Sequence, residues 1–400
     1  MNESNTFFDK FLGFLNRNAM FVILLITMVL FEILLFIKGR GSLFSPMNLT
    51  NLIAQNGYVV ILATGMLLCI LTGGNIDLSV GGIVILVGAY AGILIVNWEI
   101  DIYNAIVICL VIGGLIGAWQ AFWIAYMKIP PFIVTLAGML SFRGLALMMM
   151  GSQNIGPFPA EFKALFNNFI PASWVGDDRA AIMQVSLMTA GLICLVLVIL
   201  EVFTRIRKQR KGYTVSSLPW AVLKVATISG VLMFIFWKLG QHNGIPVLLI
   251  LLGVIIIFYD YFTQNTVFGR YLYAMGGNEK AARLSGINTK RMLFFAYTNM
   301  GVLASVAALV CVARFNQAST QAGTGYEMDA IGACYIGGAS AYGGVGKVGG
   351  AVIGAIFMGV LNMGMSLLGW DQNLQKVIKG LVLLAAIVFD VLSKNRELSA

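Results

Sequence analysis

Long apolar runs limit how this chain can fold. About 12 runs of mostly apolar residues follow one another along its 400 residues, with short polar or glycine-rich connectors between them. Crossing a hydrocarbon layer takes about 20 helical residues, and most of the runs reach that length. The expected spans are 19–37, 48–72, 79–97, 102–127, 131–151, 181–203, 218–238, 245–263, 291–313, 329–343, 347–369 and 373–393. The sequence therefore predicts an all-α polytopic membrane protein with about 12 transmembrane helices.

The composition excludes several other classes of protein. The chain is 59% hydrophobic and only 11% charged, whereas soluble domains carry about 25% charged residues. Its single histidine, His242, lies in a polar loop, and its five cysteines are scattered through apolar runs without a paired spacing. These residues form neither a metal cluster nor a disulfide framework, so we expect no metal and no cofactor. The amino terminus lacks a small-residue cleavage site, so 19–37 should remain as an anchor.

Basic residues predict the orientation. Lysines and arginines gather at 205–211, at 264–291 and again at 394–396. The positive-inside rule places these segments in the cytoplasm, and an even number of spans then places both termini there. We therefore interpret the net charge of +9 as a topology signal and expect no nucleic-acid partner. The expected organisation is one transmembrane domain over 1–400, with a cytoplasmic N-terminus (1–18), a cytoplasmic docking loop (264–290) and a cytoplasmic tail (394–400).

Two aspartates stand at similar places in the pattern. The stretch GNIDLSVGGIVILVGAYAG (74–92) has a counterpart in YEMDAIGACYIGGASAYGG (326–344), which sets Asp77 against Asp329. Each aspartate comes before a small-residue apolar run, so each is expected to cap a helix. One interpretation is that both are only caps. The other is that two structural repeats supply short broken helices beside a translocation path, with Asp77, Ser79, Asp329 and Arg143 as path candidates. Arg143 lies inside an apolar run and should either snorkel to the surface or face the protein interior.

The stretch AMGGNEKAARLSGINTKRM (274–292) predicts a short helix. Gly276 and Gly277 allow a sharp turn, Asn278 can cap, Glu279 follows in the first turn and Gly286 can end the helix. Such a helix is too short to be stable alone. It should therefore rest on its own bundle or the membrane surface, or else bind a cytoplasmic subunit. The glycine-rich run 341–348 lacks the first glycine and the final hydroxyl residue of a phosphate-binding loop, so we expect no nucleotide site there.

Four motifs together resemble one family. GGNIDLSVGG, PPFIVTLAGMLSFRG, YAMGGNEKAARLSGI and MDAIGACYIGGASAYGGVGKVGGAVIGA are similar, in this order, to the membrane permease subunits of bacterial monosaccharide ABC importers of the ribose, xylose and galactose type. The extra length around 204–250 is similar to xylose and multiple-sugar permeases. The resemblance covers roughly 45–393. It implies a non-enzymatic transport subunit in the bacterial inner membrane that imports a monosaccharide, such as xylose or a related pentose or hexose.

The resemblance also implies partners. These are a second copy of the chain, a cytoplasmic ATP-binding subunit with two nucleotide-binding domains and an extracytoplasmic sugar-binding protein. ATP would be bound by the partner. The resemblance implies that the ATP-binding subunit docks on Gly276, Gly277, Asn278, Glu279, Ala281, Ala282, Ser285 and Gly286.

A second class of function stays open at this point. A self-contained secondary transporter of a small solute also uses repeats with broken helices. An intramembrane enzyme is disfavoured, because the sequence has no arrangement of nucleophile and base and no metal cluster. The sequence does not name the sugar or the residues that contact it.

Overall fold

The computed structural model describes residues 19–176, 178–213 and 218–399. The predicted all-α class is confirmed. Within these ranges there is no β-strand, and the only pairings of strand type are two isolated bridges, Ile155 with Ala318 and Phe169 with Pro246.

Ten helices in the described part of the chain are long and apolar enough to cross a membrane. They are α2 (Ala19–Ile37), α3 (Pro46–Leu71), α4 (Val80–Gly92) continued by the π-helical turn η1 (Ile93–Asn97), α5 (Ile102–Ala125), α6 (Pro131–Met149), α8 (Arg179–Arg210), α9 (Leu218–Gly240), α10 (Val247–Asn265), α13 (Thr289–Phe315) and α15 (Val348–Leu367).

The expected count of 12 spans is not confirmed. The run 329–343 is not a span, because its helix α14 (Tyr326–Ile336) has only 11 residues and is about 16 Å long at 1.5 Å per residue. Helix α16 (Gln372–Ser399) covers the last expected span but is not among the ten.

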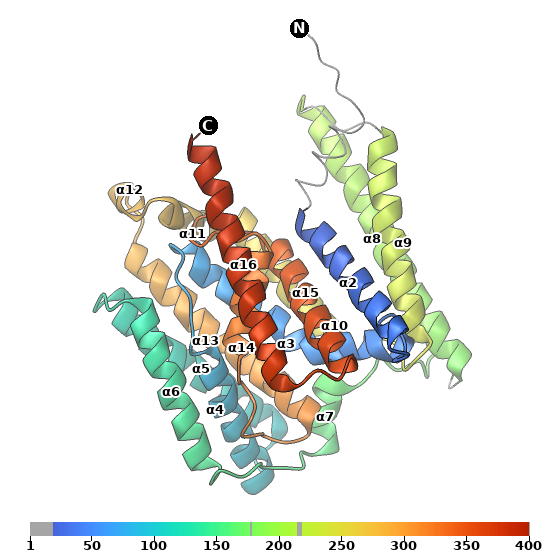
Figure 1. Cartoon of the computed structure of the whole chain (residues 1–400), viewed down its shortest axis with the longest axis horizontal. Helices are drawn as coiled ribbons and strands as arrows, with labels where there is room; N and C mark the ends of the chain where they lie inside the picture. The colour runs from blue at the N-terminus through green and yellow to red at the C-terminus, as the bar shows by residue number, and fades with distance from the viewer. Residues whose placement is uncertain (1–18, 177, 214–217, 400) are drawn as a thin grey trace.

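Four helices form the centre of the bundle. Most residues of α3, α4, α13 and α15 are buried, while α2, α5, α6, α8, α9 and α10 expose apolar side chains around them. Figure 1 shows α8 and α9 as a hairpin beside α2, on the opposite side of the molecule from α5 and α6. The start of α2, the end of α16, the end of α8 and the short helix α12 (Glu279–Leu284) all lie at one end, and α7 (Ala160–Asn167) lies toward the other (Figure 1). The segments with the most basic residues therefore share one end of the bundle.

Small residues bring α5 and α13 unusually close together. A Cβ built on Gly117 would lie 2.6 Å from the Tyr297 carbonyl oxygen, and one built on Gly301 would lie 2.2 Å from the Gly113 carbonyl oxygen. Membrane helices use such small residues because apolar burial does not drive helices together in lipid. This close packing fixes the part of α5 that carries Gln120, which takes part in the site described below.

Helix α14 begins inside the bundle and runs alongside the second half of α3. Its first residue, Tyr326, stacks on Tyr58 with ring centroids 3.9 Å apart, and Cys334 Sγ donates to the Ala63 carbonyl oxygen at 3.2 Å. Beyond α14, the Gly344 N–H donates to the Leu71 carbonyl oxygen at 3.2 Å, at the end of α3. The connector 316–325 therefore has to enter the bundle before α14 can start.

Candidate functional site

The beginnings of α4 and α14 meet inside the bundle. A Cβ built on Gly81 would lie 2.1 Å from the Gly323 carbonyl oxygen, and one built on Gly323 would lie 2.0 Å from the Gly81 carbonyl oxygen. Gly323 also has a φ of +76°, which disfavours any other residue. Only glycines allow this contact, and it brings the two predicted path segments side by side.

Asp77 is the centre of a first polar cluster. Its carboxylate is 1% exposed. Oδ1 accepts from the Ser79 backbone N–H at 2.8 Å and from Ser79 Oγ at 2.6 Å. Gln120 of α5 donates to Ser79 Oγ at 2.7 Å, while Asp77 Oδ2 is buried without a hydrogen-bond partner among the described residues. The residue before α4 is Ser79, and it has no side-chain cap. Asp77 therefore holds the turn that leads into the helix without bonding the first helical N–H groups, so its predicted capping role is not confirmed.

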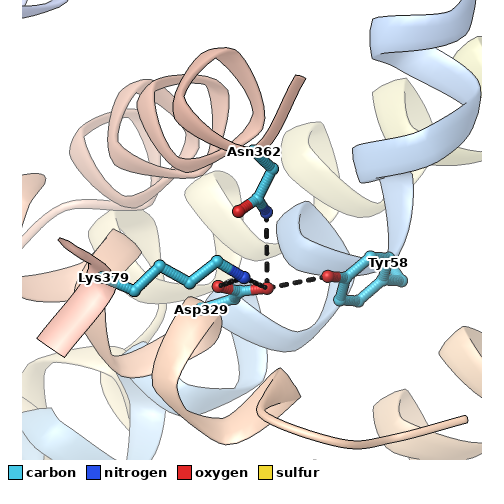
Figure 2. A network of polar contacts seen from close by, with 4 residues as sticks. All are labelled: Tyr58, Asp329, Asn362 and Lys379. Atoms are coloured by element: carbon cyan, nitrogen blue, oxygen red, sulfur yellow. Dashed lines mark hydrogen bonds and ion pairs between the residues drawn. The ribbon is translucent and has the colours of Figure 1, made fainter. Parts of the chain in front are cut away.

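Asp329 is the centre of a second cluster, drawn in Figure 2. Its Oδ2 accepts from the Tyr58 hydroxyl at 2.8 Å, from Lys379 Nζ at 3.2 Å and from Asn362 Nδ2 at 3.5 Å. The Lys379 ammonium also lies 2.9 Å from Oδ1. Asp329 is 1% exposed, whereas the Lys379 side chain is 20% exposed. One carboxylate thus joins α3, α14, α15 and α16.

The predicted capping role of Asp329 is wrong. Asp329 is the fourth residue of α14, and the residue before the helix is Gly325, in the left-handed conformation without a side-chain cap. The carboxylate is satisfied by the Lys379 ammonium and by side-chain donors instead of free backbone N–H groups. Since Asp77 lies three residues before its helix and Asp329 lies within its own, the two aspartates do not occupy matched positions, and the two structural repeats are not confirmed.

Further charges gather where α14 begins. Arg143 of α6 points into the protein, which is one of the two expected alternatives, and donates to Thr324 Oγ1 at 2.8 Å. The Glu327 carboxylate interacts electrostatically with Asp329, Arg143 and Lys379. Arg314 of α13 also interacts with Tyr58 and Tyr326, so acidic and basic side chains are gathered around the start of α14.

Sequence reasoning missed several members of the two clusters: Tyr58, Gln120, Glu327, Asn362 and Lys379. Lys379 carried a usable signal, because it lies within the expected span 373–393 and a lysine in a membrane span is itself an indication of a functional or paired group. Tyr58, Gln120 and Asn362 carried no such signal, because polar uncharged side chains are common in membrane helices.

The docking segment contains two helices, α11 (Val267–Gly277) and α12. Asn278 caps α12 as predicted, because its Oδ1 accepts from the Ala281 N–H at 3.0 Å. The end at Gly286 is also confirmed. Gly286 has a φ of +86°, its N–H donates to the Arg283 carbonyl oxygen, and the Ile287 N–H donates to that of Ala282. This pair of hydrogen bonds is the Schellman motif, which satisfies the last carbonyls of a helix.

The structure places three of the predicted docking residues, Gly276, Gly277 and Ala282, outside the outward face of α12. Gly276 and Gly277 belong to the end of α11, so the turn is made at Asn278 alone. A Cβ on Gly276 would lie 1.9 Å from the Leu71 carbonyl oxygen, so this glycine is needed for packing against α3. Ala282 is 5% exposed and faces the bundle, so it does not lie on an outward docking face.

The outward side of α12 carries a large apolar side chain. Leu284 is 87% exposed, and Glu279, Ala281 and Ser285 are exposed around the same helix. A cavity of about 840 Å³ lies beside α12, and its lining includes Asn75, Lys128, Pro131, Glu279, Arg283 and Lys290. The exposed side of α12 therefore adjoins this cavity, and Leu284 is the one large apolar side chain on that helix.

Comparisons with known proteins agree on the class of protein. The family described as "Branched-chain amino acid transport system / permease component" matches residues 48–387. The xylose transport system permease protein of Escherichia coli (strain K12) is 35% identical over 359 residues, covering 89% of this chain and 88% of that protein. The corresponding Haemophilus influenzae protein is 33% identical, covering 95% of this chain and 98% of its own length. The ribose import permease protein of Escherichia coli (strain K12) is 32% identical over 87% of each chain.

No solved structure matches the chain. The family match covers most of the sequence, and it agrees with the ten apolar helices of the described residues. The chain therefore belongs to the family of membrane permease components of the branched-chain amino acid transport type.

Proposed function

We propose that this chain is the transmembrane permease subunit of an ATP-driven importer for a monosaccharide, namely xylose or a related pentose or hexose. The observation that carries the proposal is the 35% identity to a xylose permease across 89% of the chain. The family description names branched-chain amino acids, but the relatives that match nearly end to end are named for xylose and ribose.

The proposal includes three partners. A cytoplasmic ATP-binding subunit with two nucleotide-binding domains would dock on α12, an extracytoplasmic sugar-binding protein would deliver the sugar, and a second copy of the chain would complete the pathway. The capped α12, the exposed Leu284 and the adjoining cavity support this docking position. The chain itself would bind no cofactor and catalyse no reaction, because ATP is bound and hydrolysed by the partner.

The location proposed is the bacterial inner membrane, with both termini in the cytoplasm. The start of α2, the end of α16, α12 and the basic end of α8 all lie at one end of the bundle (Figure 1). The positive-inside rule assigns such a basic end to the cytoplasm. Helix α12 and the predicted docking loop 264–290 then lie on the cytoplasmic side, where ATP is available.

A continuous chain of contacts leads from α12 to the charged cluster. Helix α11, which directly precedes α12, packs through Gly276 against the Leu71 carbonyl oxygen at the end of α3. Helix α3 carries Tyr58, whose hydroxyl donates to Asp329. Movement of α12 by the ATP-binding subunit would therefore be passed through α11 and α3 to the region where α4 and α14 meet. This is how closure of the partner would switch the path between its outward-open and inward-open forms.

The proposal is tested by genetic complementation. Cells that lack their own xylose import are given this chain with an ATP-binding subunit and a sugar-binding protein from the same organism. Uptake of radiolabelled xylose is measured with unlabelled ribose or leucine as competitor. We expect uptake that sugars inhibit and leucine does not. Uptake that persists without the ATP-binding subunit would favour a secondary transporter, and uptake inhibited only by leucine would contradict a sugar substrate.

A further inference from the structure

Helix α16 is unusually polar where it begins. Its first eight residues include Gln372, Asn373, Gln375, Lys376 and Lys379, and the strongly apolar part starts only at Leu381. Figure 1 shows α16 lying along the bundle beside α14, against which it packs. Charged side chains at such positions face a protein interior or a water-filled cavity instead of lipid chains.

One side of this polar segment is uncovered in the single chain. Asn373 and Lys376 are exposed, and Lys379, one turn further, is partly exposed. Helix α16 packs mainly on α14, so nothing else within the described residues covers this side. Contact with lipid would leave Lys376 without a polar partner, which makes water the favourable neighbour.

The Asp329 cluster borders the same side and has unused hydrogen-bonding capacity. The Lys379 ammonium has three N–H donors, and its contacts to the two oxygens of Asp329 leave one of them over. Asn362 Oδ1 is a buried acceptor without a donor among the described residues. A hydroxyl group both donates and accepts, so a solute rich in hydroxyls could use both groups.

The Asp329 carboxylate has donors besides Lys379. The Tyr58 hydroxyl and the Asn362 amide both donate to its Oδ2. The remaining donor of Lys379 and the acceptor of Asn362 are the two kinds of group that the hydroxyls of an uncharged solute would use.

We propose that the side of α16 bearing Lys376 and Lys379 borders a water-filled passage, and that Lys379 and Asn362 form a site there for the hydroxyl groups of an uncharged solute. The identity of the solute rests on the proposed function, whereas contact with water does not. The competing explanation is that the Asp329–Lys379 pair only fastens α16 to α14.

Thiol labelling tests the water-filled passage. Asn373→Cys and Lys376→Cys, which leave the Asp329–Lys379 pair intact, are made in the full chain carrying Cys194→Ser, because the other four cysteines are buried. Leu115→Cys and Leu192→Cys, on the exposed apolar faces of α5 and α8, are the lipid-facing controls. A charged, membrane-impermeant methanethiosulfonate reagent is applied to membrane vesicles with the binding-protein side outward. Thiols in water ionise and react, so we expect the two α16 positions to react at least about tenfold faster than the controls. Equal rates would overturn the passage.

Uptake by a double variant tests the hydroxyl site. Removing one partner of a buried ion pair is strongly destabilising, but replacing both is often neutral. We therefore expect Lys379→Met to lower the melting temperature, and Asp329→Asn with Lys379→Met to restore it. We also expect ATP-driven sugar uptake by the double variant to stay at least about tenfold below wild type, a loss of about 1.4 kcal/mol in solute recognition. Wild-type uptake by the double variant would show that the pair only fastens helices.

The two experiments separate the failure of this proposal from that of the proposed function. If the wild-type chain imports no sugar, the proposed function fails, and thiol labelling still decides whether α16 borders water. If the double variant does not fold, Lys379→Gln is used, because it removes the charge and keeps an N–H donor. Uptake by Lys379→Gln equal to that of wild type, together with lipid-like labelling rates, overturns the site.

Discussion

Leu284 gives the sharpest prediction about the docking surface. Its side chain is 87% exposed at the outward end of a six-residue helix, although leucine is normally buried. If the ATP-binding subunit covers α12, this side chain becomes buried on complex formation. Changing Leu284→Ala should then weaken the complex without disturbing the fold, because the side chain contacts little of its own chain.

The size of the effect follows from the exposed area. Leu284→Ala removes three carbon atoms, each worth about 0.8 kcal/mol when buried. Nearly all of the side chain is available for burial, so the loss is about 2 kcal/mol. At 1.4 kcal/mol per tenfold change, Kd for the ATP-binding subunit should rise by about 30-fold.

The measurement is titration of the purified permease, in nanodiscs, with its labelled ATP-binding subunit. Leu218→Ala is the matched control, because Leu218 is 62% exposed and lies in the region after the basic end of α8. Its Kd should equal that of wild type. If neutralising the five basic residues of 205–211 abolishes the complex while Leu284→Ala leaves Kd unchanged, α12 is not the docking element.

Three further predictions concern stability, the Asp77 cluster and ATP. Gly301→Ala should lower the melting temperature, because the added Cβ would lie 2.2 Å from the Gly113 carbonyl oxygen and overpacking costs about 1–3 kcal/mol. The control Gly253→Ala, whose added Cβ meets open space, should leave the melting temperature unchanged. Equal melting temperatures for the two variants would contradict the close packing. Asp77→Asn should reduce transport less than Asp77→Leu at matched expression, because asparagine still accepts hydrogen bonds from Ser79; equal losses would indicate a need for the charge. The purified chain should hydrolyse no ATP above background, and activity that copurifies with it in the absence of other subunits would refute this.

Local features of the sequence predicted much of the fold. The lengths of the apolar runs identified the ten spans, because crossing a membrane requires length and apolar character whatever the packing. The ends of α12 were also predictable, because an asparagine cap and a left-handed glycine act within a few residues. The expected span at 329–343 failed, because apolar character cannot separate a helix buried in protein from one that crosses lipid.

The candidate site depends on contacts that no local pattern encodes. Asp329 and Lys379 are 50 residues apart in the sequence and meet only because α14 and α16 pack together. Tyr58 of α3 donates to the same carboxylate, although it lies 271 residues before Asp329 in the sequence. Ala282 was expected on the docking face, but a six-residue helix has too few positions to show which side is buried. Asp329 was interpreted as a cap because its sequence surroundings resemble those of Asp77, and that resemblance does not extend to the position within the helix.

Uptake into proteoliposomes tests the proposed importer. The chain is reconstituted with its ATP-binding subunit, ATP is enclosed on the side of α12, and the sugar-binding protein loaded with radiolabelled xylose is added to the opposite side. We predict that xylose accumulates inside only when ATP, the ATP-binding subunit and the binding protein are all present, and that a non-hydrolysable ATP analogue stops it. Accumulation by the chain alone, driven by an ion gradient, would contradict the proposal and identify a secondary transporter.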